Sequence, residues 1–413
     1  MIKPKIVFIE PNLKNVQGHV FSVISLLSKQ KSRKIISKHF SPISFCGHKD
    51  ADINVVKGIK EFKKICTKGC FETQSETDCF LYIKNYIKKY GMKKGDLIVF
   101  TTAYINELKA VFKLVSEYNE CPKFLLHLHQ FFPPFGNPDI VSQTKIQAKY
   151  KKAFKNILVN LASYRDKVNI CVTPVKEFKR LIQSVSTDKL KINELIVPFL
   201  KPAKRFKKPE TVSFLGDGRK EKGLLVALKS FVDLSAKYPE EKFYIQVYKP
   251  RGFSVKELKD TRLLCEILES RENVYIREQG LSEIEYEKVI DNSKLIFIPY
   301  DINNYRIRFS GIACEAIMRD IPIITTHDSS VELLVKKYKN KTPYIFVEWN
   351  RNVDIISGDI CSKFDTFLKK CNNHKNFLNN PAIKDYSINN YIRQIISLFY
   401  GQSAGNSSNS VKK

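Results

Sequence analysis

Apolar residues recur along this chain in two alternating patterns. Short β-branched or aromatic runs between turn-forming residues are typical of buried strands, and longer stretches with apolar residues every three or four positions are typical of helices. Before residue 200, strands are predicted at Lys5–Glu10, Ile43–Cys46, Ile53–Val56, Leu97–Thr101, Phe124–His129, Ile157–Val159 and Ile170–Thr173. Helices are predicted near 20–28, 72–90, 104–118, 140–155 and 174–184. This alternation predicts a parallel, doubly wound α/β sheet.

The same alternation restarts after a basic segment that contains two prolines, residues 201–210. Strands are then predicted at Thr211–Gly216, Phe243–Val247, Val274–Arg277, Leu295–Pro299, Ile321–Thr325 and Tyr344–Val347. Helices are predicted near 223–237, 257–270, 282–291, 311–319, 329–338 and 353–371, with a last one that contains Ile388, Tyr391, Ile392, Ile395, Ile396 and Phe399. We therefore expect two α/β domains facing each other across a cleft. The expected boundaries are a first domain at 1–200, a linker at 201–210, a second domain at 211–380, a final helix at 381–400 and a disordered Gly/Ser/Asn-rich tail at 401–413.

One polar stretch stands directly before a predicted helix in the second domain. Ser310 and Gly311 precede an apolar-periodic run, so Ser310 is expected to cap a helix whose first N–H groups point outward. Arg306 and Arg308 lie just upstream, and a helix start with nearby cations suits a phosphate or diphosphate. Glu315 lies about one turn into the helix, where a carboxylate suits sugar hydroxyls. The alternative is an ordinary cap with solvated surface charges.

A second loop with similar chemistry opens the second domain. The sequence TVSFLGDGRKEKG predicts a strand that runs into Gly216 and Gly218, followed by Arg219 and Lys222 at a helix start. Arginine clamps a diphosphate through two hydrogen bonds, lysine adds a point charge, and glycines let the backbone approach phosphate oxygens. The dinucleotide fingerprint GxGxxG is absent, since it would require glycine in place of Glu221. A charged helix entry without a ligand is the alternative.

Two further polar sites are predicted in the first domain. The first strand is followed by a glycine turn with Gly18 and His19, where a substrate can approach the backbone. His127 and His129 end the strand KFLLHLHQ and share one face, and a proline-rich loop follows them. His129, the nearer to the loop, is our candidate for substrate contact because histidine titrates near neutrality. A buried core histidine is the alternative.

Composition narrows the class of protein further. The 413 residues carry a net charge of +28, with the larger excess in the first 200 residues, and ten cysteines. This charge suits an anionic membrane, an acidic glycan or nucleic acid, or reflects a compositional bias. Because no apolar stretch approaches the roughly 18 residues of a membrane span, a soluble cytoplasmic protein with reduced thiols is expected. Cys66, Cys70 and Cys79 lack a clear fourth ligand, so no metal site is expected.

Together these motifs resemble the GT-B glycosyltransferases of the group that includes glycogen synthases, sucrose synthases and bacterial surface-polysaccharide transferases. GDGRKEKG resembles the loop that holds the donor diphosphate in that group, with Lys222 at its lysine; its arginine more often stands where Asp217 is, so Arg219 implies a variant loop. RFSGIACEAIMRDIPIITT resembles its stretch for donor sugar, diphosphate and ribose, with Glu315 at the ribose-binding glutamate. The first glutamate of the group's pair is here Ile307.

The resemblance also covers other parts of the chain. Tyr305 and Arg308 match a Tyr-x-x-Arg-x-Ser-Gly pattern that some members have near the donor sugar or diphosphate. The turn at Gly18 and the strand-end His129 resemble acceptor-domain elements that line the cleft. The helix in DYSINNYIRQIISLFY resembles the one that crosses back onto the first domain.

The resemblance implies transfer of a hexosyl group from a nucleotide-diphosphate sugar to a glycan or lipid-linked acceptor, with retention of configuration. Its simplest setting is the assembly of bacterial lipopolysaccharide, capsule or exopolysaccharide, in the cytoplasm or on the inner face of the membrane. It implies no metal and no other cofactor, and the anionic membrane is a candidate partner. The alternative, motivated by Ile307, is a non-catalytic glycan-binding or scaffolding protein of the same fold. Nucleic acid is not expected as a partner, since no zinc finger or RNA-recognition signature is present.

Overall fold

The computed structural model describes residues 2–14, 18–48, 50–65, 76–129, 140–200, 202, 209–338, 343–350, 352–372 and 380–401. They belong to two compact units. The first unit draws on Met1–Pro133, Val141–Leu200 and Asp385–Lys413, and the second on Pro134–Ile140 and Lys201–Lys384. Each unit is built around its own parallel sheet, as the alternating pattern predicts.

The sheet of the first unit has seven strands. They are β1 (Ile6–Glu10), β2 (Ile43–His48), β3 (Phe62–Ile65), β4 (Leu97–Phe100), β5 (Lys123–Leu128), β6 (Val168–Val172) and β7 (Ile192–Glu194). All neighbouring pairs are parallel, in the order β3-β2-β1-β4-β5-β6-β7. The chain moves outward from β1 to β3 and then outward on the other side from β4 to β7. The strand order therefore reverses between β1 and β4, and ligands of such sheets bind at the carboxyl ends beside this reversal.

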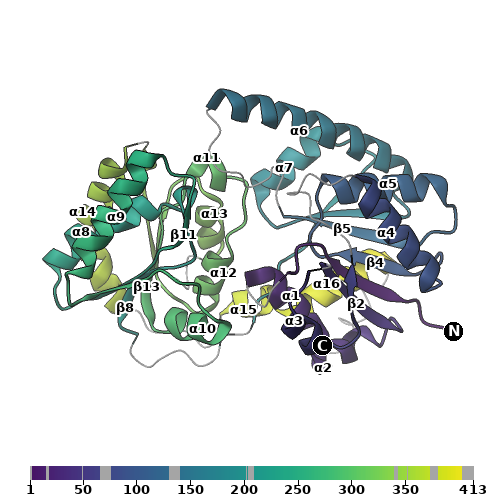
Figure 1. Cartoon of the computed structure of the whole chain (residues 1–413), viewed down its shortest axis with the longest axis horizontal. Helices are drawn as coiled ribbons and strands as arrows, with labels where there is room; N and C mark the ends of the chain where they lie inside the picture. Colours follow the sequence, from purple (N-terminus) through teal and green to yellow (C-terminus); the bar gives the residue numbers. More distant parts are fainter. Residues whose placement is uncertain are drawn as a thin grey trace, which may run out of the picture. The chain divides into compact units, whose positions relative to one another are not determined.

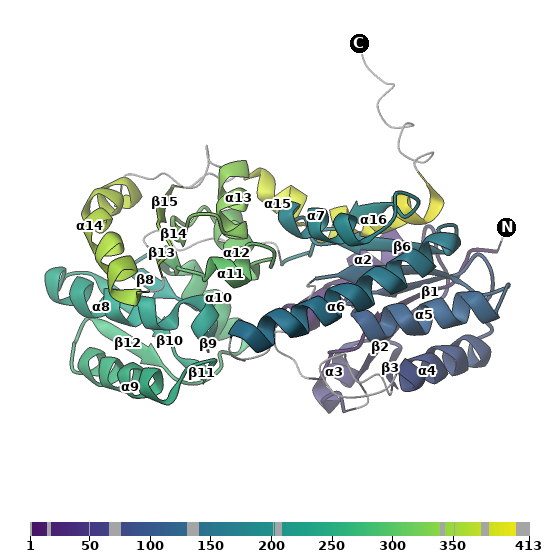
Figure 2. The same cartoon turned by 90° about the horizontal axis from the view of Figure 1, so that it is seen from above.

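Helices cover both faces of this sheet (Figures 1 and 2). They are α1 (Gly18–Ser28), α2 (Gln30–Ile36), α3 (Ile53–Gly58), α4 (Glu76–Lys89), α5 (Ile105–Glu117), α6 (Ile140–Leu161), α7 (Lys176–Val185) and the C-terminal α16 (Ile388–Tyr400). The ring of Phe399 in α16 packs edge-on against Phe40 after α2, with centroids 5.0 Å apart. The side chain of Gln394 accepts a hydrogen bond of 3.2 Å from the Ile196 N–H. The last helix thus returns to the first unit, as predicted.

The second unit repeats the plan with six strands in its main sheet. They are β8 (Thr211–Phe214), β10 (Lys242–Gln246), β12 (Val274–Arg277), β13 (Ser293–Ile298), β14 (Ile323–Thr326) and β15 (Tyr344–Val347). Their order is β12-β10-β8-β13-β14-β15, again parallel throughout. A separate two-stranded ladder pairs β9 (Asp217–Arg219) with β11 (Tyr248–Arg251). Here the strand order reverses between β8 and β13.

Helices also cover both faces of the second sheet. They are α8 (Leu224–Lys237), α9 (Val255–Glu269), α10 (Glu283–Asp291), α11 (Ile302–Tyr305), α12 (Gly311–Met318), α13 (Ser330–Lys337), α14 (Val353–Asn372) and α15 (Pro381–Asp385). One face carries α8, α9 and α14, whose apolar side chains form a single core with the strands. At its centre the ring of Phe231 packs edge-on against Phe243 and Phe297, at centroid distances of 5.1 and 4.9 Å. The opposite face carries α10, α12 and α13 (Figure 2).

Two predicted strands of the first unit are wrong. Ile53–Val56 belongs to α3, which begins because the Asp52 carboxylate caps it by accepting from the Asn54 N–H at 2.6 Å. Ile157–Val159 belongs to α6: Phe154, Ile157, Leu158 and Leu161 are buried and Val159 is exposed, which is helical spacing. Short apolar runs within longer helices were therefore misread. The short strands β3, β7, β9 and β11 and the helices α2 and α11 were not predicted, and the final helix expected at 381–400 is divided into α15 and α16.

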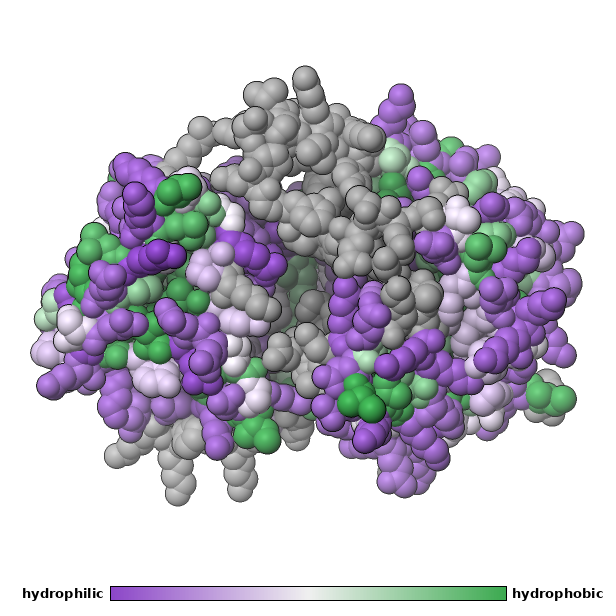
Figure 3. Space-filling model, viewed as in Figure 1, coloured by the Kyte–Doolittle hydropathy of each residue, from purple (hydrophilic) through white to green (hydrophobic). Residues whose placement is uncertain are grey.

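Several predicted features lie outside the described residues. These are most of the 201–210 linker, the tail from 402, the proline-rich loop after His129, and Cys66 and Cys70. Within the described ranges, none of the helices combines the length and the apolar character that crossing a bilayer requires. On the face drawn in Figure 3, hydrophilic side chains cover much of both units and apolar ones gather only in small groups.

Candidate functional site

The loop after β8 is shaped by two glycines with positive φ. Gly216, at φ 105°, turns the chain away from the sheet, and its N–H donates to the Gln246 side-chain oxygen at 2.9 Å. Gly223, at φ 77°, starts α8, and a Cβ atom there would lie 2.2 Å from the Pro299 carbonyl oxygen after β13. Only glycine fits this close approach. The loop therefore packs closely against the carboxyl end of β13, at the point where the strand order reverses between β8 and β13.

Lys222 lies where this loop meets the start of α12. A Cβ atom added to Gly216 would lie 3.0 Å from Lys222 Nζ and 2.9 Å from Ile312 Cδ1, so the ammonium group and the second residue of α12 flank the same backbone atom. Burial and the nearby Arg219 lower the pKa of Lys222 to about 8. A cation that is partly desolvated in this way gains from an anionic partner. The two loops that the sequence marked as phosphate-suited therefore come together.

The start of α12 offers backbone donors. Ser310 is buried and caps the helix, as predicted, because its hydroxyl accepts from the Ala313 N–H at 3.2 Å. The same hydroxyl lies 3.4 Å from the Tyr300 hydroxyl. Since the Ser310 side chain serves the fold, the groups that this helix presents to a ligand are the N–H groups of Gly311 and Ile312, which have no intrahelical partner at a helix start.

Two arginines share one carboxylate beside this helix start. Glu221 Oε1 accepts from Arg219 Nη1 at 2.9 Å and lies 3.6 Å from Arg308 Nη1. Arg219 Nη2 is also 3.4 Å from the Tyr305 hydroxyl, and Asp217 lies 3.6 Å from its Nε. Burial acts to lower the pKa of Arg219, but Tyr305, Glu221 and Asp217 together raise it, so the guanidinium stays charged. Arg308, on the loop before α12, and Arg219, on the loop after β8, are thus held close together.

Tyr305 is buried beside the two arginines and contacts both of them. Its ring is buried and packs on the ring of Tyr300, with centroids 3.9 Å apart, and the guanidinium carbon of Arg308 lies 5.9 Å from its centroid. Tyr305 therefore orients the two arginines with its hydroxyl and ring. The sequence predicts Tyr305 near the donor sugar or diphosphate, and in the structure it contacts the two arginines.

Glu315 faces the neighbouring helix α10. Its Oε2 accepts a 2.6 Å hydrogen bond from the Tyr286 hydroxyl. Burial raises the pKa of Glu315 to about 7, with Glu287 and Asp291 adding to the rise, while Arg319 and Tyr286 oppose it. Glu315 is half-buried and lies one turn into α12, as predicted. Its carboxylate can accept hydroxyl hydrogen bonds from a ligand bound at the helix start.

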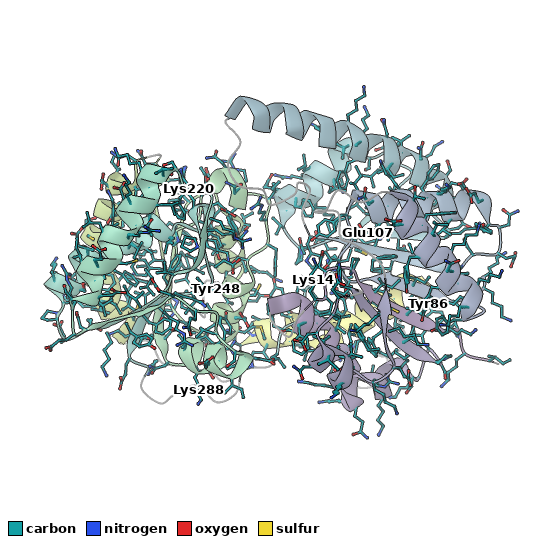
Figure 4. The ribbon with its side chains drawn as sticks, viewed as in Figure 1. Lys14, Tyr86, Glu107, Lys220, Tyr248 and Lys288 are labelled. Carbon is teal, nitrogen blue, oxygen red and sulfur yellow. The ribbon has the colours of Figure 1, made fainter. Side chains whose placement is uncertain are left out.

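In the first unit, acidic side chains lie near the point where the strand order reverses. Glu10 ends β1, is buried, and accepts from the Asn12 N–H at 3.0 Å and the Thr101 hydroxyl at 2.8 Å. Glu107, labelled in Figure 4, is buried in the first turn of α5 and accepts from the Tyr104 N–H at 3.0 Å. Burial raises the pKa of Glu10 and of Glu107 to about 7. Both carboxyl groups thus titrate near neutrality.

The two histidines of β5 differ in exposure. His127 is buried, and burial together with its neighbour His129 holds the pKa of His127 well below its ordinary value. His129 is half-buried just past the strand end, and its Nε2 donates to the Thr101 carbonyl at 2.8 Å. Their rings lie 4.2 Å apart. His127 fits the alternative of a core histidine, whereas His129 is the more accessible of the two.

The remaining predicted positions carry less information. Gly18 and His19 form the first residues of α1, two residues before the expected helix start at 20, and the His19 side chain is not among those described. Among the described residues, no group of three or more His, Cys, Asp and Glu side chains is arranged to hold a metal ion. Cys79 is buried and free in α4.

Sequence reasoning missed the acids that organise the site. In the sequence, Glu221 stands out only because it breaks a glycine motif. An acid between the two lysines of KEK could nevertheless have indicated a residue that pairs with nearby cations. Tyr286 and Glu10 carried no signal, since their roles depend on contacts between elements distant in sequence. The described groups can hold a dianionic ligand between Lys222 and the start of α12.

Comparison with known proteins agrees with this architecture. No protein-family model matches the sequence, and no curated protein matches it. Among solved structures, HepE of Anabaena in complex with UDP and glucose matches with a TM-score of 0.64 and 10% identity, over 96% of this chain and 100% of that one. Sucrose-phosphate synthase from Thermosynechococcus elongatus matches with a TM-score of 0.62 and 14% identity, over 97% of this chain and 100% of that one. A glycosyltransferase from Rickettsia africae matches with a TM-score of 0.59 and 15% identity, over 98% and 100%. At these identities the likeness establishes the fold: the chain has the GT-B fold of glycosyltransferases.

Proposed function

We propose that this protein is a glycosyltransferase that moves a sugar, most simply a hexose, from a nucleoside-diphosphate sugar to a glycan or lipid-linked acceptor. The observation that carries the proposal is the meeting of Lys222 and the start of α12 on either side of Gly216. A lysine ammonium and free helix N–H groups together suit the diphosphate of a nucleotide sugar. The GT-B fold supports the same conclusion by analogy only.

The proposed reaction breaks the bond between the sugar C1 and the β-phosphate oxygen and forms a bond from C1 to an acceptor hydroxyl oxygen, whose proton is released. Negative charge grows on the leaving diphosphate as the bond breaks. Lys222 and Arg219 neutralise it, and the N–H of Gly311 donates to it. Glu315 accepts from the ribose hydroxyls. These roles use side chains and backbone of the second unit, with no metal or other cofactor.

The first unit is proposed to bind the acceptor. His129, at the end of β5, would contact the transferred sugar or stabilise its developing positive charge, and Gly18 and His19 would border the acceptor. The Thr101 carbonyl fixes the tautomer of His129 by accepting from Nε2. We also propose retention of configuration, a role in bacterial surface-polysaccharide assembly, and peripheral contact of the basic first unit with anionic membrane from the cytoplasm. Flotation with anionic liposomes tests the membrane contact.

A donor screen tests the proposal directly. Purified protein is incubated with nucleoside-diphosphate sugars of different base and sugar, and both the melting temperature and the release of nucleoside diphosphate with candidate acceptors are measured. A bound donor raises the melting temperature by mass action. We expect one base to give a clear rise, and Lys222→Ala to lower turnover by about 100-fold or more, as loss of a charge-stabilising group does in other enzymes.

The matched control is Lys220→Ala. Lys220, labelled in Figure 4, lies two residues away in the same loop but pairs with Glu257 at 2.6 Å and is largely exposed. Its removal should leave turnover within about twofold, since exposed pairs contribute little. If no nucleotide sugar raises the melting temperature or is consumed, or if the two variants behave alike, the proposed function is wrong.

A non-catalytic glycan-binding protein of the same fold is the second candidate. The half-buried Ile307, directly before Arg308, provides no carboxylate for the transferred sugar. Such a protein would bind glycan and release no nucleoside diphosphate from any donor. The release assay therefore separates the two candidates.

A further inference from the structure

We propose that Tyr286 of α10 is a positioning residue that aims the Glu315 carboxylate at the ribose of the bound nucleotide and thereby sets the preference for ribose over deoxyribose. This inference rests on the proposed function, because it assigns a supporting residue to the same nucleotide site. It concerns a contact between two helices that the motifs of α12 alone do not reveal. Tyr286 itself is not proposed to touch the nucleotide.

The contact that carries the inference is short and direct. The Tyr286 hydroxyl donates to Glu315 Oε2 at 2.6 Å, from one helix to the next. A hydroxyl bonded to an ionised carboxylate at this distance is a charge-assisted hydrogen bond, which is stronger than a neutral one. Within the described part of the chain, no hydrogen bond occupies the second oxygen of Glu315, Oε1. One oxygen is therefore anchored to α10, and the other remains to accept from a ligand.

A buried ion-pair network fixes the two helices at this contact. Arg319 lies one turn after Glu315, at the C-cap of α12, and is buried. Its Nε donates to Asp291 Oδ1 at 2.8 Å, and its Nη2 pairs with Glu287; both partners belong to α10. Arg319 thus holds the two helices together and adds a favourable charge beside Glu315, while the Tyr286 hydroxyl supplies the hydrogen bond from α10 that directs the Glu315 carboxylate.

The charge state of Glu315 depends on the same neighbours. The groups that face it are Tyr286, Glu287 and Asp291 from α10 and Arg319 from its own helix. Burial and the two acids raise the pKa of Glu315 to about 7, whereas Arg319 and the Tyr286 hydroxyl favour the ionised form. A ribose offers two adjacent hydroxyl donors, and an ionised carboxylate accepts from them better than a neutral acid does. Loss of the tyrosine hydroxyl should therefore both loosen the carboxylate and favour its neutral form.

The test compares a ribonucleoside diphosphate with its 2′-deoxy and 3′-deoxy analogues by calorimetry at pH 7.5, with the base that the donor screen selects. In the natural protein the ribonucleotide should bind about 10-fold to 100-fold more tightly than a deoxy analogue, the range for a hydrogen bond to a charged group. In Tyr286→Phe, the ribonucleotide should lose about fivefold to tenfold in affinity while the deoxy analogues lose little. The preference for ribose should also collapse in Glu315→Gln.

The matched control is Tyr275→Phe, since Tyr275 is exposed on β12 and stacks on Tyr244 at a centroid distance of 5.3 Å. It should keep the full preference for ribose. If Tyr286→Phe lowers the affinities for all the nucleotides equally, or lowers only the melting temperature, Tyr286 has only a structural role in packing α10 against α12. The inference is then overturned. If the natural protein binds no nucleoside diphosphate, the proposed function fails first and the inference fails with it.

Discussion

Each of the two sheets reverses its strand order at one point, and the side chains at these two points have opposite chemistry. In the first unit, the reversal between β1 and β4 is bordered by the buried acids Glu10 and Glu107. In the second, the reversal between β8 and β13 is bordered by Arg219, Lys222 and Arg308, each only partly buried. The same parallel topology thus carries a pair of buried acids in one unit and a cationic cluster in the other.

The difference follows from how deeply these ionisable side chains are buried in each unit. Glu10 and Glu107 are fully enclosed, so their pKa values rise to about 7 and about half of each carboxyl group is protonated at neutral pH. Arg219 and Arg308 in the second unit are only partly buried and share the carboxylate of Glu221, which holds the two guanidinium groups close together. The strand reversal is the position where ligands of such sheets bind, and the cationic side chains there favour an anion in the second unit.

The largest effect is expected where the cationic loop is packed most tightly. Gly223→Ala would place a Cβ atom 2.2 Å from the Pro299 carbonyl oxygen, at a positive φ of 77°. Left-handed backbone alone costs an alanine about 1–2 kcal/mol, and the overlap requires the backbone to move. We expect loss of about 3 kcal/mol or more of unfolding free energy, together with loss of nucleotide binding. Urea unfolding and calorimetry measure the two losses.

Gly95→Ala in the first unit is the control for backbone strain. Gly95 has a φ of 99°, but no atom lies within 4 Å of the position that a Cβ would take. Its cost should be about 1 kcal/mol, from strain alone. Equal losses in the two variants would show that the approach of the cationic loop to β13 is not tight, and the contrast between the units would weaken.

A smaller effect is expected from pH on nucleotide-sugar binding by the second unit. Burial lowers the pKa of Lys222 to about 8, so the ammonium is lost as pH rises above that value. Burial raises the pKa of Glu315 to about 7, so its carboxylate is lost as pH falls below that value. Affinity should therefore be highest between about pH 7 and 8 and decline toward tenfold per pH unit on either side.

Calorimetry with an intact nucleotide sugar measures this profile, since its diphosphate does not titrate near neutrality. Glu315→Gln should remove the acidic decline and Lys222→Met the alkaline one. A flat profile from pH 6 to 9 in the natural protein would contradict these assignments.

The smallest effect is expected on stability, at the acids of the first unit. On folding, burial raises the pKa of Glu10 from 4.5 to about 7, so the folded state binds its proton more tightly. The unfolding free energy therefore falls as pH rises through this interval, and the loss is complete above about pH 7. Glu10→Gln should raise the melting temperature by a few degrees at pH 8 and leave it nearly unchanged at pH 5.

The control for this change is Glu177→Gln, at a partly exposed residue of α7 that pairs with Arg180 at 2.8 Å. It should shift the melting temperature little at either pH. If Glu10→Gln has the same effect at pH 5 as at pH 8, burial of this carboxyl group does not govern the pH dependence of stability. The raised pKa assigned to Glu10 would then be wrong.

The cationic site of the second unit was largely predictable from the sequence. The glycines and cations of GDGRKEKG and the cap at Ser310 are local signals, and the structure brings the two stretches together at Gly216. The cap prediction was right, yet the hydroxyl of Ser310 turned out to be committed to its own helix. Local pattern locates a phosphate-suited helix start but does not decide which of its groups face a ligand.

The acidic side was not predictable. Glu10 follows an apolar run like any strand end, and Glu107 lies in an amphipathic helix. Their burial and raised pKa values come from packing between β1, β4 and α5, which are far apart in the chain. The same holds for Tyr286, whose partner Glu315 is 29 residues away. Short apolar runs such as Ile157–Val159 failed for the related reason that strand and helix look alike over three residues.

The central claim is that Lys222 and the start of α12 hold a diphosphate, and its most direct test is the affinity ratio between a nucleoside diphosphate and the matching monophosphate. We predict that the diphosphate binds at least about 10-fold more tightly to the natural protein, as a charge-assisted contact of about 1.5–3 kcal/mol requires. The ratio should fall close to one in Lys222→Ala and stay unchanged in Lys220→Ala. A ratio in Lys222→Ala equal to that of the natural protein would contradict the claim.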